Sequence, residues 1–230
     1  FTGPFLRYAA PASHILKSSD RQKESILHIY ELDTPSVVID LDVLEKNIKG
    51  MADHCKKLGI TLRGHTKSHK NPEIAKMQVA AGSQGIVCQK LGDAENMVRN
   101  GLDDILMTYN IVGRQKVQRL CELARQVKMT VTVDSLAVAE GISKQATHDG
   151  VTIGVLVEID TGSKRTGVQS PAAAEELGKQ VQSLPGLELR GLMTYPSVAE
   201  SKPVIDEAVE RFSNANLPLD IISGGGTGHE

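Results

Sequence analysis

Apolar residues follow two alternating patterns along the chain from residue 34 onward. Short, nearly continuous apolar runs alternate with longer stretches in which apolar residues recur every three or four positions. The runs predict buried strands, and the stretches predict amphipathic helices. A β-branched run, Val37–Ile39, opens the series as a candidate strand. Helical spacing from Leu44 to Leu58 follows it, with Gly59 as the expected helix stop.

Further apolar runs predict the strands of one sheet, at Ile60–Arg63, Gly85–Gln89, Asp104–Thr108, Met129–Val133, Thr152–Ile159, Leu187–Met193 and Asp220–Ile222. The helices between them are predicted at Pro72–Ala81, Asp93–Asn100, Val117–Val127, Ala137–Gln145, Ala172–Leu184 and Val204–Asn214. Each strand is followed by a helix, with a repeat of about 22 to 30 residues, which favours a closed (β/α)8 TIM barrel over an open Rossmann sheet. No G-x-G-x-x-G motif follows the first strand, which also counts against a dinucleotide fold.

The pattern divides the chain into a leader or N-terminal extension at residues 1–33 and a barrel domain at residues 34–230. We expect the eighth barrel strand to lie outside this chain, because an open barrel edge would expose unpaired backbone groups. Residues 1–19 lack Asp and Glu but contain Arg7 and Lys17. This segment is therefore either a loosely packed leader or the remnant of a transit peptide.

Composition excludes several classes of function. The net charge of −2 gives no electrostatic footprint for nucleic acid, and no apolar run reaches the roughly 20 residues that span a membrane. Cys55, Cys88 and Cys121 lie far apart without a C-x-x-C pair, which fits neither a disulfide framework nor a zinc site. We expect buried, reduced thiols and a cytoplasmic protein, with organellar targeting as the alternative.

The chemistry of such a barrel is expected at the carboxyl ends of its strands. After the first barrel strand, the segment from Arg63 to Lys70 carries two lysines, two histidines and one arginine. Neighbouring cations favour the neutral form of a lysine, which can then form a Schiff base with a carbonyl group. Lys67 is the predicted catalytic amine, with His65 beside it. A solvated basic loop is the alternative interpretation.

The loop after the last predicted strand suits a phosphate group. Ser223, Gly224, Gly225, Gly226 and Thr227 follow one another there. Glycines let backbone N–H groups approach a phosphate closely, and the hydroxyl groups add donors. Barrels often bind phosphate after strands seven and eight, so this loop is the predicted phosphate site.

Three more strand ends carry candidate groups. Arg165 follows the fifth strand and could hold a phenolate or carboxylate oxygen, or could be a surface arginine. Tyr195 ends the sixth strand and could stack on a flat cofactor ring, or could cap the barrel core. Gln89 ends the second strand and offers an amide to a cofactor or substrate.

Together these segments resemble the D-threonine aldolase and D-serine dehydratase group. The run from His65 to Lys70 is similar to its H-x-K-[TS]-H-K signature, and Asp160–Gly167 is similar to its D-T-G-x-x-R-x-G loop. The run Val87–Glu95 resembles a stretch of the aldolase branch, and Ser223–Gly228 resembles the family's phosphate loop. The resemblance covers the chain from about Thr34 to its end.

This resemblance implies an alanine racemase-type barrel that binds pyridoxal phosphate. It places the cofactor on Lys67, Arg165 near the cofactor's phenolic oxygen, and Tyr195 at the pyridine ring. It also implies a small D-amino acid as substrate and a homodimer with partner-supplied groups. A divalent metal, Mn, Mg or Zn, is expected from a C-terminal β-rich domain outside this chain, so no metal ligand is named here.

The sequence departs from the family pattern at two places. Gly64 stands where the family usually has proline, which should alter the stiffness of the loop. Pro196, Ser197 and Val198 follow the tyrosine, where the family often has a glycine and a histidine. No histidine is therefore carried over to this segment.

The resemblance favours a lyase that acts on D-configured β-hydroxy amino acids. Aldolase cleavage would give glycine and an aldehyde, and the run Val87–Glu95 favours this reaction. A dehydratase, which would release ammonia and a keto acid, is the second interpretation. A non-catalytic carrier of pyridoxal phosphate is the third, although the lysine motif of such carriers differs. A decayed barrel without cofactor is the last alternative.

Overall fold

A computed structural model of the protein describes residues 28–226. The chain divides into two compact units, residues 1–60 and residues 61–230. In the first unit, the described residues form a short 3-10 helix η1 (Ile29–Glu31) and the helix α1 (Leu41–Leu58). Residues 1–27 of the predicted leader lie outside the described residues, and the predicted boundary after residue 33 stays a prediction.

The start and end of α1 follow from two local signals. The side chain of Asp40 accepts the backbone N–H of Val43 at 3.1 Å, which caps the helix. Gly59 adopts a left-handed conformation, with φ of 69°, and ends it as predicted. The strand predicted at Val37–Ile39 is wrong: these residues pair with no described strand, and Val37 is 98% exposed. β-branched residues favour extended backbone, but a strand also needs a partner.

The second unit alternates strands and helices from end to end. Its strands are β1 (Arg63–His65), β2 (Gly85–Cys88), β3 (Asp104–Met107), β4 (Lys128–Val133), β5 (Ile153–Glu158), β6 (Leu187–Met193) and β7 (Ile221–Ser223). Its helices are α2 (Pro72–Ala80), α3 (Leu91–Arg99), α4 (Arg114–Ala124), α5 (Leu136–Asp149), α6 (Pro171–Ser183) and α7 (Lys202–Asn214), with a 3-10 turn η2 (Ala199–Ser201) before the last. The predicted alternation is confirmed.

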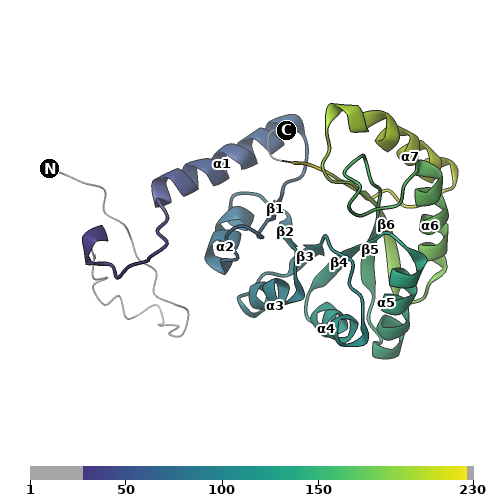
Figure 1. Cartoon of the computed structure of the whole chain (residues 1–230), viewed down its shortest axis with the longest axis horizontal. Coiled ribbons are helices and arrows are strands. Elements are labelled where there is room, and N and C mark those ends of the chain that lie inside the picture. Colours follow the sequence, from purple (N-terminus) through teal and green to yellow (C-terminus); the bar gives the residue numbers. More distant parts are fainter. Residues whose placement is uncertain (1–27, 227–230) are drawn as a thin grey trace. The chain divides into compact units, whose positions relative to one another are not determined.

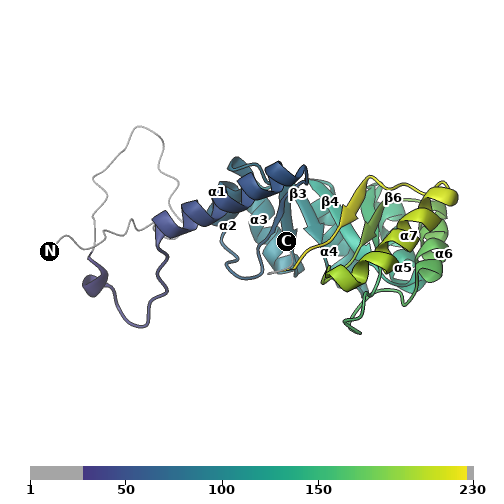
Figure 2. The ribbon, with the colours of Figure 1, turned by 90° about the horizontal axis from the view of Figure 1, so that it is seen from above.

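The seven strands form one parallel sheet in chain order, β1 to β7. Figures 1 and 2 show this sheet curled, with α2 to α7 along its outer side. The second unit is therefore a half-barrel of the predicted (β/α) type, and the eighth strand of a closed barrel is not among residues 28–226. The carboxyl ends of all seven strands lie along one edge, because parallel strands run in the same direction.

The first barrel strand begins three residues later than predicted. Ile60 donates its N–H to the carbonyl of Cys55, in the last turn of α1, and so belongs to the helix end. Pairing with β2 starts at Arg63 and ends at His65, which faces Val87 in register. The shift places His65 within β1 and Lys67 two residues beyond its end.

The two faces of the sheet pack differently. The outer face contributes side chains such as Ile105, Val131 and Val155 to a large apolar core shared with the helices. A second, small apolar cluster holds Val87, Leu106, Leu156 and Met193, with Tyr195 and Ile221 packed against it. Because successive strand residues point to opposite faces, this cluster marks the inner face. All three cysteines are buried and free, as predicted.

None of the helices in residues 28–226 is long and apolar enough to cross a membrane.

Candidate functional site

Two cations from different loops meet one aromatic ring at the carboxyl edge of the sheet. The Lys67 Nζ atom lies 5.2 Å from the centroid of the Tyr195 ring. The Arg165 Cζ atom lies 5.0 Å from the same centroid. Both distances are within the range of a cation–π interaction. The structure thus brings together three residues that are up to 128 positions apart in the chain, since 195 − 67 = 128.

The segment that carries Lys67 is fixed by its neighbour Thr66, which is fully buried. Thr66 donates both its N–H, at 2.9 Å, and its hydroxyl, at 3.0 Å, to the carbonyl of Val87 in β2. The N–H of Lys70 then donates to the carbonyl of Thr66 at 2.8 Å and closes a turn. These bonds fix the backbone on both sides of Lys67, while its side chain remains exposed.

His65 lies beside Lys67 in a neutral form. Burial, and next the positive charge of Lys67, lower the pKa of His65 from 6.5 to about 4. Its Nδ1 atom accepts the backbone N–H of Lys67 at 3.3 Å. A neutral ring that accepts at Nδ1 carries its proton on Nε2. His65 therefore adds no positive charge next to the amine at neutral pH.

The loop that carries Arg165 is held by the carboxylate of Asp160. This side chain accepts the N–H groups of Gly162 at 2.9 Å, Ser163 at 2.8 Å and Lys164 at 2.8 Å. Burial raises the pKa of Asp160, but these hydrogen bonds outweigh it, so the pKa lies below its usual value. The carboxylate thus organises the turn immediately before Arg165.

The end of the same loop is tied back to β5. The hydroxyl of Thr166 donates to the carboxyl of Glu158 at 2.6 Å, and Glu158 is 3% exposed. Burial raises the pKa of Glu158, against the hydrogen bond from Thr166. Gly167 has a φ of 103°, and a side chain there would collide with the backbone of Asp160. The loop is therefore anchored on both sides of Arg165.

The glycine-rich loop begins at Ser223, the last residue of β7. Gly225 has a φ of 135°, a value that favours glycine, and Gly226 has a φ of 158°. A side chain added at Gly225 would meet no atom of residues 28–226 within 4 Å, so the described part of the chain leaves space beside this residue. The structure places Ser223, Gly224, Gly225 and Gly226 at the same edge as Tyr195; the predicted Thr227 lies outside the described residues.

Gln89 is the predicted residue that the structure does not join to the others. Its side chain is exposed after β2, and no hydrogen bond within residues 28–226 links it to Lys67, Tyr195 or Arg165. Its proposed contact with a cofactor stays a prediction, as do the roles of the other site residues.

Sequence reasoning missed four residues that shape the site. Thr66 and Asp160 hold the two cation loops, Glu158 anchors the second loop, and Ser197 bonds to the glycine loop. Thr66 and Asp160 stand inside the motifs already singled out, and Glu158 lies two residues before the second of these motifs. Buried polar residues next to predicted site residues were the signal available, since such groups need hydrogen-bond partners.

Gly64 shows why proline is not required before the lysine motif. A side chain at Gly64 would overlap the amide of Gln78. The N–H of Gly64 donates to the hydroxyl of Ser83 at 3.1 Å, a bond that proline could not make. The departure from the family pattern is thus matched by local partners.

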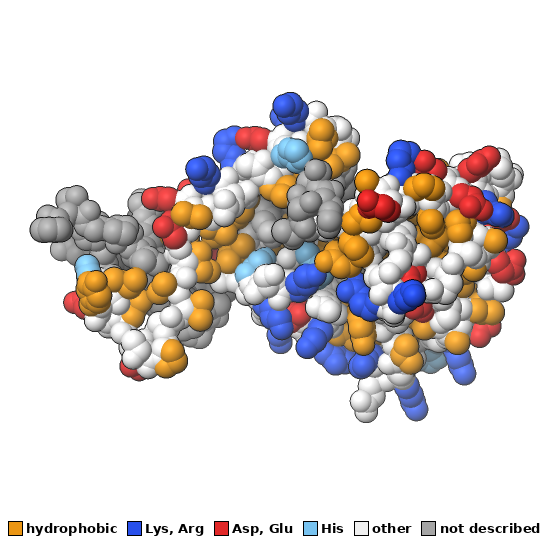
Figure 3. All heavy atoms as spheres, turned by 45° about the horizontal axis from the view of Figure 1, so that its top comes forward, with side chains coloured by type: hydrophobic (Ala, Val, Ile, Leu, Met, Phe, Trp, Pro, Cys, Tyr) orange, Lys and Arg blue, Asp and Glu red, His pale blue; other side chains and the backbone are white. Residues whose placement is uncertain are grey.

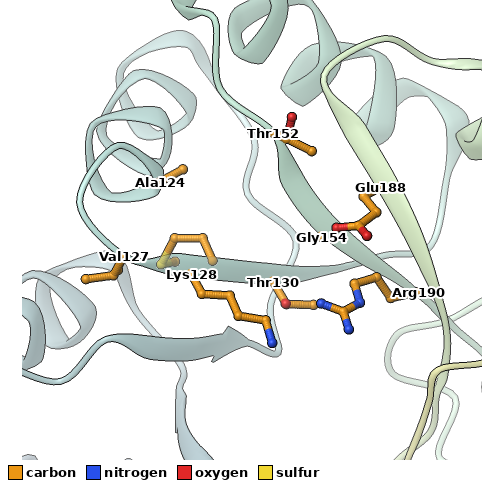
Figure 4. A pocket seen from close by; sticks show the side chains of 9 residues that line it. Ala124, Val127, Lys128, Thr130, Thr152, Gly154, Glu188 and Arg190 are labelled. Carbon is orange, nitrogen blue, oxygen red and sulfur yellow. The ribbon is translucent and has the colours of Figure 1, made fainter.

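A pocket of about 340 Å³ lies at the opposite ends of the strands, where β4, β5 and β6 begin. Figure 4 shows Lys128, Thr130, Glu188 and Arg190 around it. None of the predicted site residues lines this pocket. Within residues 28–226, no group of three or more His, Cys, Asp or Glu side chains is placed to hold a metal ion.

Basic side chains are frequent in the loops at the carboxyl edge, which carry Lys67, Lys70, Lys90, Lys164 and Arg165. Figure 3 shows Lys and Arg side chains gathered on one face of the second unit, with histidine beside them. Such a local concentration of positive charge suits an anionic ligand although the net charge of the chain is −2.

The chain is similar in sequence to known proteins. Residues 39–225 match the family model of the alanine racemase N-terminal domain. The chain is 36% identical over 211 residues to a D-threonine aldolase from an Arthrobacter species, covering 86% of this chain and 56% of the relative. It is 35% identical over 214 residues to a 3-hydroxy-D-aspartate aldolase from Paracoccus denitrificans, covering 86% and 55%.

Solved structures agree with these relatives. The D-threonine aldolase from Filomicrobium marinum superimposes with a TM-score of 0.83 at 36% identity, covering 85% of this chain and 57% of that one. The D-threo-3-hydroxyaspartate dehydratase from a Delftia species gives 0.75 at 30% identity, covering 86% and 56%. The chain thus spans little more than half the length of the relatives it matches. It belongs to the alanine racemase N-terminal domain family.

Proposed function

We propose that the protein is a pyridoxal phosphate-dependent lyase that cleaves D-configured β-hydroxy amino acids to glycine and an aldehyde. The observation that carries the proposal is the meeting of Lys67 and Arg165 at the ring of Tyr195. An amine, a permanent cation and an aromatic ring at one place match an aldehyde cofactor that is flat and negatively charged. The names of the relatives, aldolases and dehydratases, support the reaction class.

The described residues fit this cofactor. Lys67 supplies the amine for its aldehyde, and Arg165 can donate to an anionic oxygen on its ring. The ring of Tyr195 offers a flat surface for stacking. The space that the described residues leave beside Gly225, and the backbone N–H groups of the glycine loop, suit its phosphate. When bound, the cofactor stabilises negative charge at the Cα atom of an amino acid.

The residues of this chain then bind and orient the substrate. Arg165 and the other basic groups of the edge attract its carboxylate. His65, neutral with its proton on Nε2, can donate a hydrogen bond without adding charge. As the bond between Cα and Cβ breaks, the β-hydroxyl loses its proton and becomes the aldehyde oxygen. Cα gains a proton in turn, so glycine is the second product.

The proposal is tested first by labelling. The protein is incubated with pyridoxal phosphate, reduced with borohydride and digested, and the modified peptide is identified by mass spectrometry. We expect one modified residue, Lys67. Modification of a different lysine, or none, overturns the proposal. Lys70 is the internal control, because it lies three residues away in the same segment.

A second experiment separates the reactions. The protein is given D-threonine or 3-hydroxy-D-aspartate with a divalent metal, and aldehyde, keto acid and ammonia are measured, with L-threonine as control. We expect aldehyde and glycine from the D-isomers alone. Ammonia and a keto acid in place of the aldehyde identify a dehydratase. Labelling of Lys67 without turnover of either substrate, in protein that binds the metal, identifies a cofactor carrier. Either result overturns the aldolase assignment.

A homodimer and a metal supplied by residues outside this chain also belong to the proposal. The relatives are nearly twice as long as the matched region. Sedimentation of the protein and metal analysis of the purified protein test these two points.

A further inference from the structure

The segment after β6 and the glycine loop after β7 are joined residue by residue. The N–H of Thr194 donates to the carbonyl of Ser223 at 2.9 Å, which continues the parallel pairing of β6 with β7. The N–H of Ser197 donates to the carbonyl of Gly225 at 2.9 Å. The N–H of Gly225 donates back to the hydroxyl oxygen of Ser197 at 3.0 Å. Ser197 therefore contacts the glycine loop through both its backbone and its side chain.

The hydroxyl of Ser197 accepts the N–H of Gly225, which would otherwise donate to β6 within the sheet. In a parallel sheet, a residue donates its N–H to the carbonyl of one residue on the neighbouring strand. Its own carbonyl then accepts the N–H of the residue two positions further along that neighbouring strand. Since Thr194 donates to Ser223, the next donor to the carbonyl of Thr194 would be Gly225. Gly225 donates to Ser197 instead. The side chain of Ser197 thus ends the pairing of β6 and β7 at Ser223.

The contact is close as well as specific. A side chain built on Gly224 would overlap the hydroxyl oxygen of Ser197, while its other neighbours would lie at 3.4 Å or more. Gly224 does not have a positive φ, so its backbone would accept alanine. Among the described residues, only the hydroxyl of Ser197 comes close enough to exclude a side chain there. A side chain at Gly225, in contrast, would meet no atom of these residues within 4 Å.

We propose that Ser197 is a positioning residue for the phosphate loop. Because the hydroxyl of Ser197 accepts the N–H of Gly225, this N–H does not pair with β6. The loop therefore turns away from the sheet, and the glycine backbone is fixed in an open curve. Backbone N–H groups in such a curve can converge on an anion. The ligand class is a phosphate monoester, here that of pyridoxal phosphate, so the inference rests on the proposed function.

A variant without the hydroxyl separates positioning from stability. In Ser197→Ala, the N–H of Gly225 can return to the carbonyl of Thr194, so the fold keeps its number of hydrogen bonds while the loop flattens. We expect the dissociation constant for pyridoxal phosphate to rise about tenfold, since hydrogen bonds to a charged group are the stronger ones. The affinity for pyridoxal, which lacks the phosphate, and the melting temperature should stay unchanged. Ser197→Thr keeps the hydroxyl and should restore the affinity.

Two further variants make the test specific. Ser201→Ala is the matched control, because its buried hydroxyl accepts the N–H of Val198 in the same segment but does not contact the glycine loop. It should not change the ratio of the two affinities. Gly224→Ala should weaken pyridoxal phosphate binding in the wild-type background and have little effect in Ser197→Ala, because the overlap is with the hydroxyl.

The outcomes distinguish this inference from the proposed function. If the wild-type protein takes up no pyridoxal phosphate, both are overturned. If it does, and Ser197→Ala binds it as tightly as the wild type, the role of Ser197 alone is overturned. Equal losses of affinity for pyridoxal and pyridoxal phosphate also contradict it, because they indicate general damage to the site.

Discussion

The two loops that bring a cation to Tyr195 are built with opposite chemistry. The Arg165 loop is held by carboxylates: Asp160 accepts three backbone N–H groups, and Glu158 accepts the hydroxyl of Thr166. The Lys67 segment is held by neutral groups, namely the hydroxyl of Thr66, backbone carbonyls and the ring of His65. Within residues 28–226, no carboxylate forms an ion pair with Lys67; Asp93 pairs with Lys70 at 3.8 Å instead.

The difference matches the roles proposed above for the two cations. A guanidinium stays charged at any ordinary pH, so nearby carboxylates can shape its loop without changing its state. A lysine that forms a covalent bond must give up its proton, and an adjacent carboxylate would stabilise the protonated form. We infer that the fold can use negative charge to build the Arg165 loop but must avoid it around Lys67.

The largest expected effect comes from removing each cation in turn. Lys67→Ala should abolish the visible absorbance of bound pyridoxal phosphate, because no other amine replaces the covalent bond. Arg165→Ala should keep that absorbance and weaken binding about tenfold, since it loses one charge-assisted contact. Spectrophotometric titration measures both. Retained absorbance in Lys67→Ala, or its complete loss in Arg165→Ala, would contradict the division of roles.

The second expected effect concerns the carboxylate of the Arg165 loop. Asp160→Ala leaves three backbone N–H groups without their acceptor, so the turn before Arg165 should loosen. We expect cofactor affinity to fall to about the level of Arg165→Ala, and the double variant to be no worse than either single one. Glu175→Ala on α6 is the control, since that carboxylate also accepts hydrogen bonds but lies outside the loops of the site. Additive losses would indicate that Asp160 acts independently of Arg165.

Much of this arrangement could be predicted from the sequence, for a reason that the fold supplies. Parallel strands end at one edge, so residues after β1, β5, β6 and β7 had to lie near one another once the alternation was recognised. Lys67, Arg165 and Tyr195 meet for that reason. The start of β1 was harder to predict, because an apolar residue such as Ile60 fits both a buried strand and the end of α1. Only the three-dimensional structure shows the hydrogen bond from its N–H to the carbonyl of Cys55.

Other parts of the site could not be predicted because they depend on loop conformation. That Asp160 accepts three N–H groups requires the left-handed turn at Lys164, whose φ is 52°. That Ser197 reaches Gly225 depends on where β6 and β7 stop pairing, which no residue pattern indicates. The strand predicted at Val37–Ile39 was wrong for a different reason. Its residues favour a strand, but it has no partner strand within residues 28–226.

The third expected effect comes from placing a negative charge next to Lys67. His65→Asp puts a carboxylate beside Lys67, which should favour the protonated amine. We expect Schiff base formation at pH 7 to slow several-fold and its pH dependence to move to higher pH, measured by stopped-flow absorbance. His65→Asn is the matched control without charge and should change the rate less. Equal rates in the two variants would show that negative charge near Lys67 is tolerated.

The smallest expected effect is on stability, and it tests whether His65 is neutral in the folded protein. Its pKa falls from 6.5 to about 4 on folding, so between these values the unfolded chain binds more protons than the folded one. The stabilisation from the neutral ring is therefore complete above about pH 6.5 and is lost as the pH falls toward 4. Because the ring is only half-buried, solvent screening should keep the effect small.

The measurement is the difference in melting temperature between the wild type and His65→Asn, without cofactor, at several pH values from 7.5 to about 4.5. We expect the wild type to lose more stability than the variant over this range, while His69, whose pKa burial also lowers, contributes equally to both. A constant difference would mean that folding leaves the pKa of His65 unchanged, and a difference that grows in favour of the wild type at low pH would mean that folding raises it. In either case burial would not keep the ring beside Lys67 neutral as described, and the contrast between the two loops would lose its electrostatic basis.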